Sequence, residues 1–235
     1  MSVWNWEGFW SYFTNLYLLE GALWTIGLTI NTLVFGGIIG LVLAVMRLSD
    51  NRVLSGAAQG YIWIFRGTPL LVQLIIIYTG LPQLGLVRFT VLQSALLGLA
   101  LNEAAYLSEI LRGGILSVPK GQIEAARALG LKRMQIFNRI VLPQALRVII
   151  PPLGNSVNGL LKTTSIASVI SMEEVLRRGQ ILMQQKFQVL EVFMVVAILY
   201  LAMTTCWDFV QRRIEAHYGK AYGPAVEPQL ARDDH

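Results

Sequence analysis

Polar and ionisable side chains recur at helical spacing inside two long apolar segments. The first stripe consists of Asn102, Tyr106, Glu109 and Gly113, with Glu103 on its flank. The second stripe consists of Asn155, Asn158, Lys162 and Ser165. Residues three and four apart share one face of a helix. An ionisable group near the centre of a membrane span costs about 2.5–3.5 kcal/mol, so such groups usually face a cavity or a partner. We therefore predict that the two stripes face one water-filled pathway.

The composition places these stripes in a membrane protein. Of the 235 residues, 54% are hydrophobic and only 14% are charged, and the mean hydropathy is +0.55. A soluble globular chain carries about 25% charged residues, so this chain has too few to cover a water-facing surface. The stretches Gly21–Met46 and Gly67–Val87 contain no charged residue. A soluble enzyme, a disordered chain and a disulfide-stapled domain are poor fits, and the single Cys206 permits no internal disulfide.

Five hydrophobic segments are long enough to cross a bilayer. At about 1.5 Å per residue each reaches about 30 Å, and they must be helices because open strands would leave unpaired amides in lipid. The predicted spans are Glu20–Met46, Ala57–Gly80, Phe89–Leu111, Ile149–Ile170 and Leu190–Gln211. We predict an all-α integral membrane protein, with an aromatic interfacial segment at 1–19, a transmembrane domain at 20–213 and a cytoplasmic tail at 214–235.

The Lys and Arg residues predict the orientation of these spans. With the N-terminus outside, 13 of the 19 Lys and Arg residues lie in inner segments and four in outer ones, while Arg66 and Lys162 fall inside spans. The positive-inside rule therefore predicts an outer N-terminus and a cytoplasmic C-terminus. This bias accounts for the net charge of +5, so we expect no nucleic-acid partner. The first basic residue is Arg47, so a cleavable signal peptide is not expected and the first span is retained.

The long cytoplasmic connection at 112–147 carries the most specific pattern. Glu124 is followed by two alanines, then by Gly130 after three residues and by an I-x-L-P run ending at Pro143. The alanines allow a short helix to seat closely in a groove, and Gly130 supplies a C-cap turn without a Cβ penalty. Pro143 is expected to stop the following helix from continuing unbroken into the next span.

This spacing matches the EAA-x3-G-x9-I-x-LP signature of ABC importer permeases at every fixed position, and the chain resembles their polar amino-acid uptake branch over roughly 21–213. Four other segments carry the same resemblance: Phe65–Gln73, Ala104–Tyr106 with Glu109 and Arg112, Leu142–Ala145, and Lys162–Ser165. The chain departs from the family where Thr163 replaces a common Asp, which removes a carboxylate beside Lys162, and where Ile166 replaces a common Leu.

The resemblance implies a MetI-like permease subunit of the bacterial inner membrane that imports polar amino acids by alternating access. It implies a second permease copy or paralogue, two cytoplasmic ATPases and an extracytoplasmic solute-binding protein as partners. The residues expected to couple to the ATPases are Gly121, Gln122, Glu124, Ala125, Ala126 and Gly130. The chain has no G-x4-G-K-[ST] pattern and no His or Cys set with metal-ligand spacing. We therefore expect no catalytic residue, metal or cofactor of its own, with ATP bound by the partner subunits.

The residues expected along the substrate pathway are Asn102, Glu103, Tyr106, Glu109, Asn158, Lys162 and Ser165. Glu103 lies about 12 Å and Lys162 about 20 Å from the inner boundary, so their side chains are predicted to pair, whereas Glu109, at about 3 Å, is too distant. Either the pair binds the two ends of an amino acid, with Glu103 attracting the α-ammonium group, or it joins two helices without touching substrate.

Other functions remain open from the sequence. Glu103, Glu109 and Lys162 could form the proton relay of an ion-driven carrier or channel, although no inverted repeat is evident. A membrane anchor for a cytoplasmic complex is a third possibility. Arg66 either snorkels to the inner surface or lines an inner gate. An outer cluster, Glu173, Glu174, Arg177 and Arg178, either contacts a binding protein or forms a solvated helix face.

Overall fold

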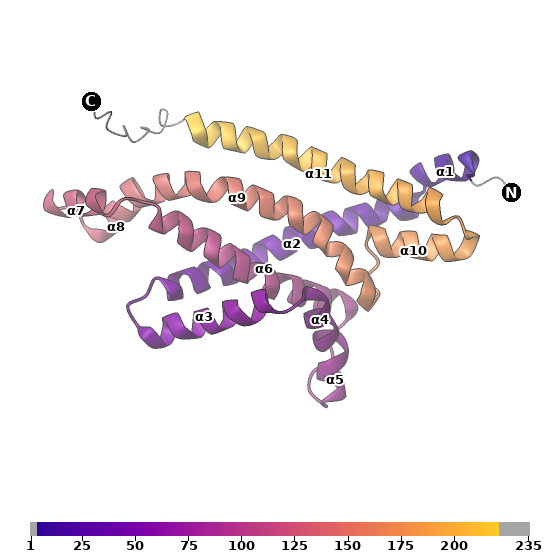
Figure 1. Cartoon of the computed structure of the whole chain (residues 1–235), viewed down its shortest axis with the longest axis horizontal. Coiled ribbons are helices and arrows are strands. Elements are labelled where there is room, and N and C mark those ends of the chain that lie inside the picture. The colour runs from indigo at the N-terminus through magenta and orange to yellow at the C-terminus, as the bar shows by residue number, and fades with distance from the viewer. Residues whose placement is uncertain (1–3, 221–235) are drawn as a thin grey trace, which may run out of the picture.

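The computed structural model describes residues 4–220, with the backbone alone for 219–220, and all regular structure in this range is helical (Figure 1). The α-helices are α1 (Trp6–Phe13), α2 (Leu16–Arg47), α3 (Arg52–Gly67), α4 (Leu70–Ile75), α5 (Leu81–Gln83), α6 (Val91–Leu116), α7 (Lys120–Ala128), α8 (Arg133–Ile136), α9 (Leu142–Thr163), α10 (Val175–Lys186) and α11 (Val189–Lys220). Two π-helical turns, η1 (Ile76–Gly80) and η2 (Phe137–Val141), and a 3-10 helix, η3 (Thr164–Ile170), join them.

The predicted all-helical membrane fold is confirmed. By length and composition, three helical stretches of the described chain could cross a membrane, namely Leu16–Arg47, Arg133–Ile170 and Val189–Tyr218. A fourth, Arg52–Gly67 with Leu70–Gln83, qualifies as a span that is broken by a bend of 101°. The remaining predicted span corresponds to α6, whose 26 residues are long enough but include the polar stripe. In Figure 1, α1 and α10 lie at one end of the molecule, and α7 and α8 lie at the other.

The second predicted span is not one continuous helix, so the prediction was wrong for Ala57–Gly80. The helix α3 stops at Gly67, and Thr68 adopts extended backbone angles of φ −118° and ψ 145°. Steric conflict with the following Pro69 ring disfavours helical angles at Thr68. The side chain of Gln73 satisfies the carbonyls freed at the break, because its Nε2 donates to the oxygens of Phe65 (3.0 Å) and Thr68 (3.1 Å).

The expectation that Pro143 stops a helix from continuing unbroken into the fourth span was also wrong. The chain is helical without a break from Arg133 to Ile170. Proline lacks an N–H group, and in an α-helix its ring clashes with the carbonyl four residues back. The preceding turn widens to the π-helical segment η2, in which the Leu142 N–H donates to the Phe137 carbonyl five residues back. The proline is therefore accommodated by a wider turn.

Close packing of α2 against α6 fixes the helix that carries the first polar stripe. A Cβ atom on Gly36 would lie 3.1 Å from the Ala100 carbonyl oxygen, and one on Gly40 would lie 3.0 Å from the Ala104 carbonyl oxygen. The helix backbones approach this closely because both positions lack a side chain. Gly36 and Gly40 therefore allow the close packing of α2 on α6, whereas a Cβ atom on Gly37 would meet no atom within 4 Å.

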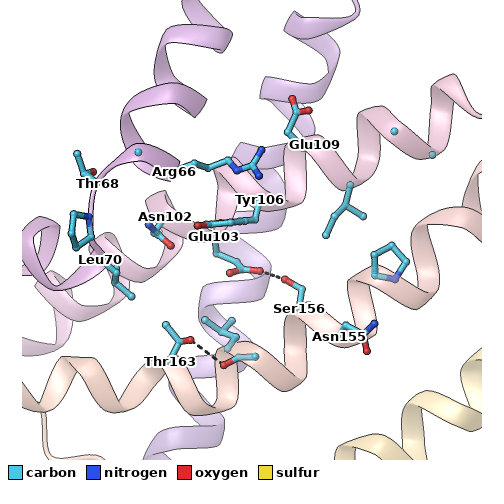
Figure 2. A pocket seen from close by; sticks show the side chains of 18 of the residues that line it. Arg66, Thr68, Leu70, Asn102, Glu103, Tyr106, Glu109, Asn155, Ser156 and Thr163 are labelled. Carbon is cyan, nitrogen blue, oxygen red and sulfur yellow. Dashed lines mark hydrogen bonds between the residues drawn. The ribbon is translucent and has the colours of Figure 1, made fainter.

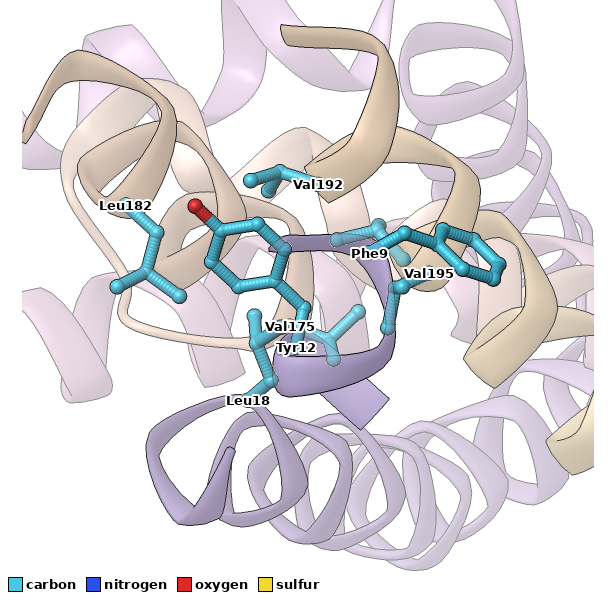
Figure 3. Packing of buried hydrophobic residues seen from close by; sticks show 8 residues of the cluster. Phe9, Tyr12, Leu18, Val175, Leu182, Val192 and Val195 are labelled. Carbon is cyan, nitrogen blue, oxygen red and sulfur yellow. The ribbon is translucent and has the colours of Figure 1, made fainter. Parts of the chain in front are cut away.

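A compact apolar cluster holds the end of the molecule where α1 lies (Figure 3). Phe9 and Tyr12 of α1 are buried against α10 and α11, while Trp6 and Trp10 on the opposite face are 64% and 62% exposed. The cluster contains Phe9, Tyr12, Leu18, Val175, Leu182, Val192, Val195 and Val196. The aromatic N-terminal segment is therefore an amphipathic helix, as its predicted place at a membrane interface requires.

The predicted boundary between the last span and the tail falls inside a helix. The helix α11 continues past residue 213 to Lys220. The part of the predicted tail at 221–235 lies outside the described residues.

Candidate functional site

A cavity of about 1100 Å³ lies between α3, α4, α6 and α9 (Figure 2). Four of the residues expected along the pathway line it: Asn102, Glu103, Tyr106 and Glu109. The facing wall, which belongs to α9, includes Asn155, Ser156, Gly159 and Thr163. The bend after α3 contributes Arg66, Thr68 and Pro69. The break in the second span therefore forms one end of the cavity.

Glu103 is the carboxylate buried in the cavity wall. It is 8% exposed, and one of its oxygens accepts a hydrogen bond from the Ser156 hydroxyl of α9 (Figure 2). A buried carboxylate is costly unless it is hydrogen-bonded or paired with a cation. The single hydroxyl leaves acceptor capacity on Glu103 for a positively charged group. Ser156 was missed in the sequence because it lies one residue beside the second polar stripe, outside its helical periodicity.

Asn102 holds the bend rather than presenting a free amide to the cavity. Its Nδ2 donates to the Phe65 carbonyl (3.0 Å) and to Oε1 of Gln73 (3.1 Å). Gln73 is buried, and it bonds the same Phe65 carbonyl. The two amides therefore satisfy the backbone where α3 ends, which fixes the bend that shapes the cavity.

Arg66 and Tyr106 form a stacked pair at the cavity wall. The guanidinium carbon of Arg66 lies 5.2 Å from the centroid of the Tyr106 ring, within the range of a cation–π contact. Arg66 also lines a smaller neighbouring cavity of about 230 Å³ together with Arg47 and Glu109. Arg66 is exposed and lines both cavities, so snorkelling to the inner surface and lining an inner gate both stay predictions.

Glu109 joins two helices at the α7 end of the cavity. Its carboxylate lies 2.8 Å from Arg112 within α6 and 3.8 Å from Arg47 at the end of α2. Arg47 also donates to Gln59 of α3 at 3.1 Å. Glu109 therefore lines the cavity with its charge already neutralised by two arginines.

The second polar stripe does not face this cavity as predicted. Asn158 donates to the Asp208 carboxylate of α11 at 2.5 Å. Lys162 and Ser165 line a separate cavity of about 460 Å³ with residues of α11. The predicted ion pair between Glu103 and Lys162 is not formed among the described residues, so that prediction was wrong. Of the second stripe, Asn155 alone lines the main cavity.

The packing of α11 against α9 explains this difference. The indole N–H of Trp207 donates to the Gly154 carbonyl at 2.8 Å. A Cβ atom on Gly154 would lie 2.4 Å from the Gln211 side chain, so α11 lies directly on this face. Residues 154, 158 and 162 share one face of α9. The face that meets Glu103 is carried by Ser156 and its neighbours instead.

The EAA segment forms the short helix α7, and the predicted C-cap at Gly130 is confirmed. Gly130 has φ +78°, the left-handed region that favours glycine. Its N–H donates to the Arg127 carbonyl (2.9 Å), and the Leu131 N–H donates to the Ala126 carbonyl (3.1 Å). These two bonds are the Schellman arrangement, which ends a helix sharply.

The alanines of this segment have different environments. Ala126 is buried in an apolar cluster with Val118, Ile136 and Val141, so it anchors α7 to its own chain. Glu124, Ala125, Gly121 and Gln122 are exposed. Gln122 accepts a hydrogen bond from Gln144 Nε2 at 2.6 Å, which ties α7 to α9. The exposed residues of α7 form a rigid surface connected to the helix that carries Ser156.

At the opposite end, two residues of the outer charged cluster serve the fold. Glu174 is fully buried and caps α10 by accepting the N–H groups of Leu176 and Arg177. Burial raises the pKa of the Glu174 carboxyl above its usual range. Arg178 is 6% exposed and lies 2.6 Å from Glu20 of α2. Both are therefore buried structural contacts rather than a solvated helix face.

Comparisons with known proteins agree with this architecture. The chain is 38% identical to the arginine transport system permease protein ArgU of Corynebacterium glutamicum, over 93% of this chain and 73% of that protein. It is 43% identical to the nopaline transport system permease protein NocM of Agrobacterium fabrum, over 80% and 81% of the two chains. A crystal structure of an amino acid ABC transporter with histidines matches with a TM-score of 0.81 and 34% identity, over 86% and 94% of the chains.

A family model, described as binding-protein-dependent transport system inner membrane component, matches residues 36–220. The match includes the bend, the cavity and the α7 segment. The chain is a permease subunit of an ABC importer in the inner membrane, and its family works with ATPase and substrate-binding partners. It belongs to the family of binding-protein-dependent transport system inner membrane components.

Proposed function

We propose that this permease carries polar amino acids and that Glu103 binds their α-ammonium group in the main cavity. The observation that carries the proposal is a buried carboxylate, oriented by Ser156, in the wall of a cavity of about 1100 Å³. A carboxylate in a low-dielectric site attracts a cation far more strongly than one in water. Relatives named for the transport of arginine, octopine and nopaline support an amino-acid substrate.

The remaining groups of the cavity suit a zwitterionic substrate. Arg66 supplies a guanidinium, which can bind a carboxylate through two parallel hydrogen bonds. Its cation–π contact with Tyr106 holds the guanidinium at the wall. Glu103 and Arg66 replace the predicted pair of Glu103 and Lys162 as groups for the two ends of an amino acid. Asn102 then fixes the bend that shapes the site, and Glu109 pairs with Arg47 and Arg112. Neither residue binds substrate.

The same proposal assigns energy coupling to α7. Its exposed residues, Gly121, Gln122, Glu124 and Ala125, contact one of two ATPase subunits, while Ala126 and Gly130 hold the helix in shape. ATP is bound by those subunits, and this chain needs no cofactor. A second permease copy or a paralogue completes the pathway, and a solute-binding protein delivers the substrate. Closure of the ATPases shifts α7 and the connected α9 as a rigid body, which opens the cavity alternately to each side.

Uptake by the reconstituted complex tests the assignment of Glu103. Proteoliposomes that contain the permease, its ATPase and its binding protein are assayed with labelled arginine, histidine and glutamine. Glu103→Gln keeps the size and hydrogen bonding of the side chain but removes its charge, so uptake is expected to fall at least tenfold. Ser156→Ala is expected to have a smaller effect of the same kind, and Glu7→Gln, at an exposed position of α1, serves as the control.

Two results would contradict the proposal. Unchanged affinity and rate in Glu103→Gln would remove this residue from the substrate site. Accumulation of solute by the permease alone, without ATPase or ATP, would favour an ion-driven carrier instead.

A further inference from the structure

A small apolar pocket with a basic rim lies at the end of the molecule where α7 and α8 lie (Figure 1). It has a volume of about 300 Å³ and is formed by the end of α6, by α7 and α8, and by the turn η2. Three of its lining residues are cations, namely Lys120, Arg127 and Arg133. The other lining residues are apolar, and Leu116 and Phe137 among them are exposed. The pocket therefore combines an apolar interior with positive charge.

The three cations have no counter-charge in the part of the chain that the structure describes. None of them takes part in an ion pair there, and no Asp or Glu of the described residues lines the pocket. Glu124, the acidic residue of the connection at 112–147, is exposed and lies outside the pocket wall. The positive-inside rule accounts for basic residues on this side of the membrane, but not for their place around an apolar pocket. A ligand that complements the pocket carries a negative charge next to an apolar part.

The pocket lies at the predicted depth of the lipid headgroups. The third predicted span ends at Leu111, and α6 continues to Leu116, about 7 Å further at 1.5 Å per residue. The headgroup layer adds about 5–7 Å to each side of the hydrocarbon core. Leu116 is therefore expected at the inner surface of the bilayer, where basic pockets bind the headgroups of anionic lipids. Such a lipid supplies both the negative charge and the apolar part.

Lys120 and Arg127 lie on a different side of α7 from the residues that we assign to an ATPase contact. Helical spacing places Lys120, Ile123 and Arg127 on one flank of α7, and all three line the pocket. Gly121 and Ala125 lie on another side of the helix, outside this pocket. The pocket can therefore be occupied while α7 contacts an ATPase.

We infer that this pocket binds an anionic phospholipid of the inner leaflet. The phosphate lies between Lys120, Arg127 and Arg133, and the adjoining part of an acyl chain enters the apolar pocket. Lys120 and Arg127 are about 10 Å apart along α7, so both long side chains can reach one headgroup between them. A volume of about 300 Å³ is too small for a whole lipid, so the rest of the lipid stays in the bilayer. The bound lipid contacts α6, α7 and α8 together and thereby stabilises this end of the fold.

Thermal unfolding of the purified complex of permease and ATPase tests the site. The complex is titrated in neutral detergent with phosphatidylglycerol, which is anionic, or with phosphatidylcholine, which is zwitterionic. A ligand that binds the folded state raises the thermal midpoint, so phosphatidylglycerol is expected to act at the lower concentration.

Neutralisation of the rim should remove this preference. Each cation near an anionic surface contributes roughly fivefold in affinity, so the triple variant is expected to need at least tenfold more phosphatidylglycerol for the same shift. The triple variant combines Lys120→Gln, Arg127→Gln and Arg133→Gln, and its response to phosphatidylcholine should equal that of the wild type. An unchanged response to phosphatidylglycerol would overturn the site.

A matched control variant removes three other exposed cations that do not line the pocket, by Arg52→Gln, Lys132→Gln and Arg212→Gln. It should keep the wild-type response to phosphatidylglycerol, and a loss equal to that of the triple variant would assign the effect to general surface charge. If the triple variant does not fold, the wild-type complex at high salt replaces it. Screening should then remove most of the difference between the two lipids, and an unchanged difference would refute the proposal.

Two other classes of ligand give distinct results. Glycerol phosphate, which has no acyl chain, should leave the midpoint unchanged, and a shift as large as that of the lipid would indicate a site for a soluble phosphate instead. Loss of the ATPase from a folded triple variant in phosphatidylcholine vesicles would show that the cations bind the ATPase, and it would likewise overturn the lipid site. None of these measurements needs transport, so they test the pocket independently of the proposed import function.

Discussion

Replacement of Gly130 by residues with a Cβ atom should destabilise the capped end of α7, by an amount that depends on the residue. Gly130 has φ +78°, and a Cβ atom built there meets no heavy atom within 4 Å. The cost of a side chain is therefore conformational rather than a clash. For an L-residue the left-handed region costs roughly 1–2 kcal/mol, and Asn tolerates it better than Ala or Val. The expected order of activity is Gly, then Asn, then Ala, then Val.

The size of the effect follows from the population of the capped turn. A loss of about 1–2 kcal/mol lowers that population by a factor of roughly 5–30. If the ATPases recognise only the capped form, uptake in Gly130→Ala should fall by up to the same factor. Membrane insertion should be unchanged because Gly130 is exposed and lies outside the predicted spans.

Coupled assays in proteoliposomes measure this loss. Uptake and ATP hydrolysis are recorded together with the ATPase and the loaded binding protein, and Gly130→Ala should hydrolyse more ATP for each amino acid imported. Gly56→Ala, at an exposed helical position of α3 with nothing within 4 Å, is the matched control. Equal uptake and equal ATP use in the Asn, Ala and Val variants would refute the reasoning that the left-handed cap shapes the coupling surface.

Three further predictions concern the packing that positions the cavity and its ends. Gly40→Val should push α2 away from α6, where a Cβ atom would already lie 3.0 Å from a backbone oxygen, and should reduce the yield of folded permease in membranes by several-fold. Gln73→Leu removes the donor to the Thr68 carbonyl and the acceptor of the Asn102 amide, while the Phe65 carbonyl keeps its bond from Asn102. The expected cost is about 1–3 kcal/mol, which a lower thermal midpoint and reduced uptake would reveal. Burial raises the pKa of Glu174 above its unfolded value of about 4.3, so stability should fall as the pH rises through that window. Glu174→Gln should flatten this part of a thermal midpoint series from pH 4 to 7, and an unchanged slope would contradict the assignment.

The local features of the α7 segment could be predicted because they depend on neighbours in sequence. The Gly130 N–H donates to the Arg127 carbonyl three positions back, and the Leu131 N–H donates to the Ala126 carbonyl five positions back. The break at Thr68 and Pro69 could not be predicted in the same way. A residue before proline usually avoids helical angles, but in this chain Leu142 is helical before Pro143. Hydrophobicity alone masked it, because Ala57–Gly80 is apolar on both sides of the break.

The sequence by itself determined that the chain is an all-helical membrane protein, where its apolar segments lie, and which residues share a stripe. Those properties follow from composition and from a periodicity of 3.6 residues within one helix. It could not determine how each stripe is rotated about its helix relative to the others. Contacts between distant residues fix that rotation: Gly36 and Gly40 seat α6 on α2, and Gly154 seats α11 on α9. Only the tertiary structure therefore decided that Glu103 meets Ser156 while Lys162 turns toward α11.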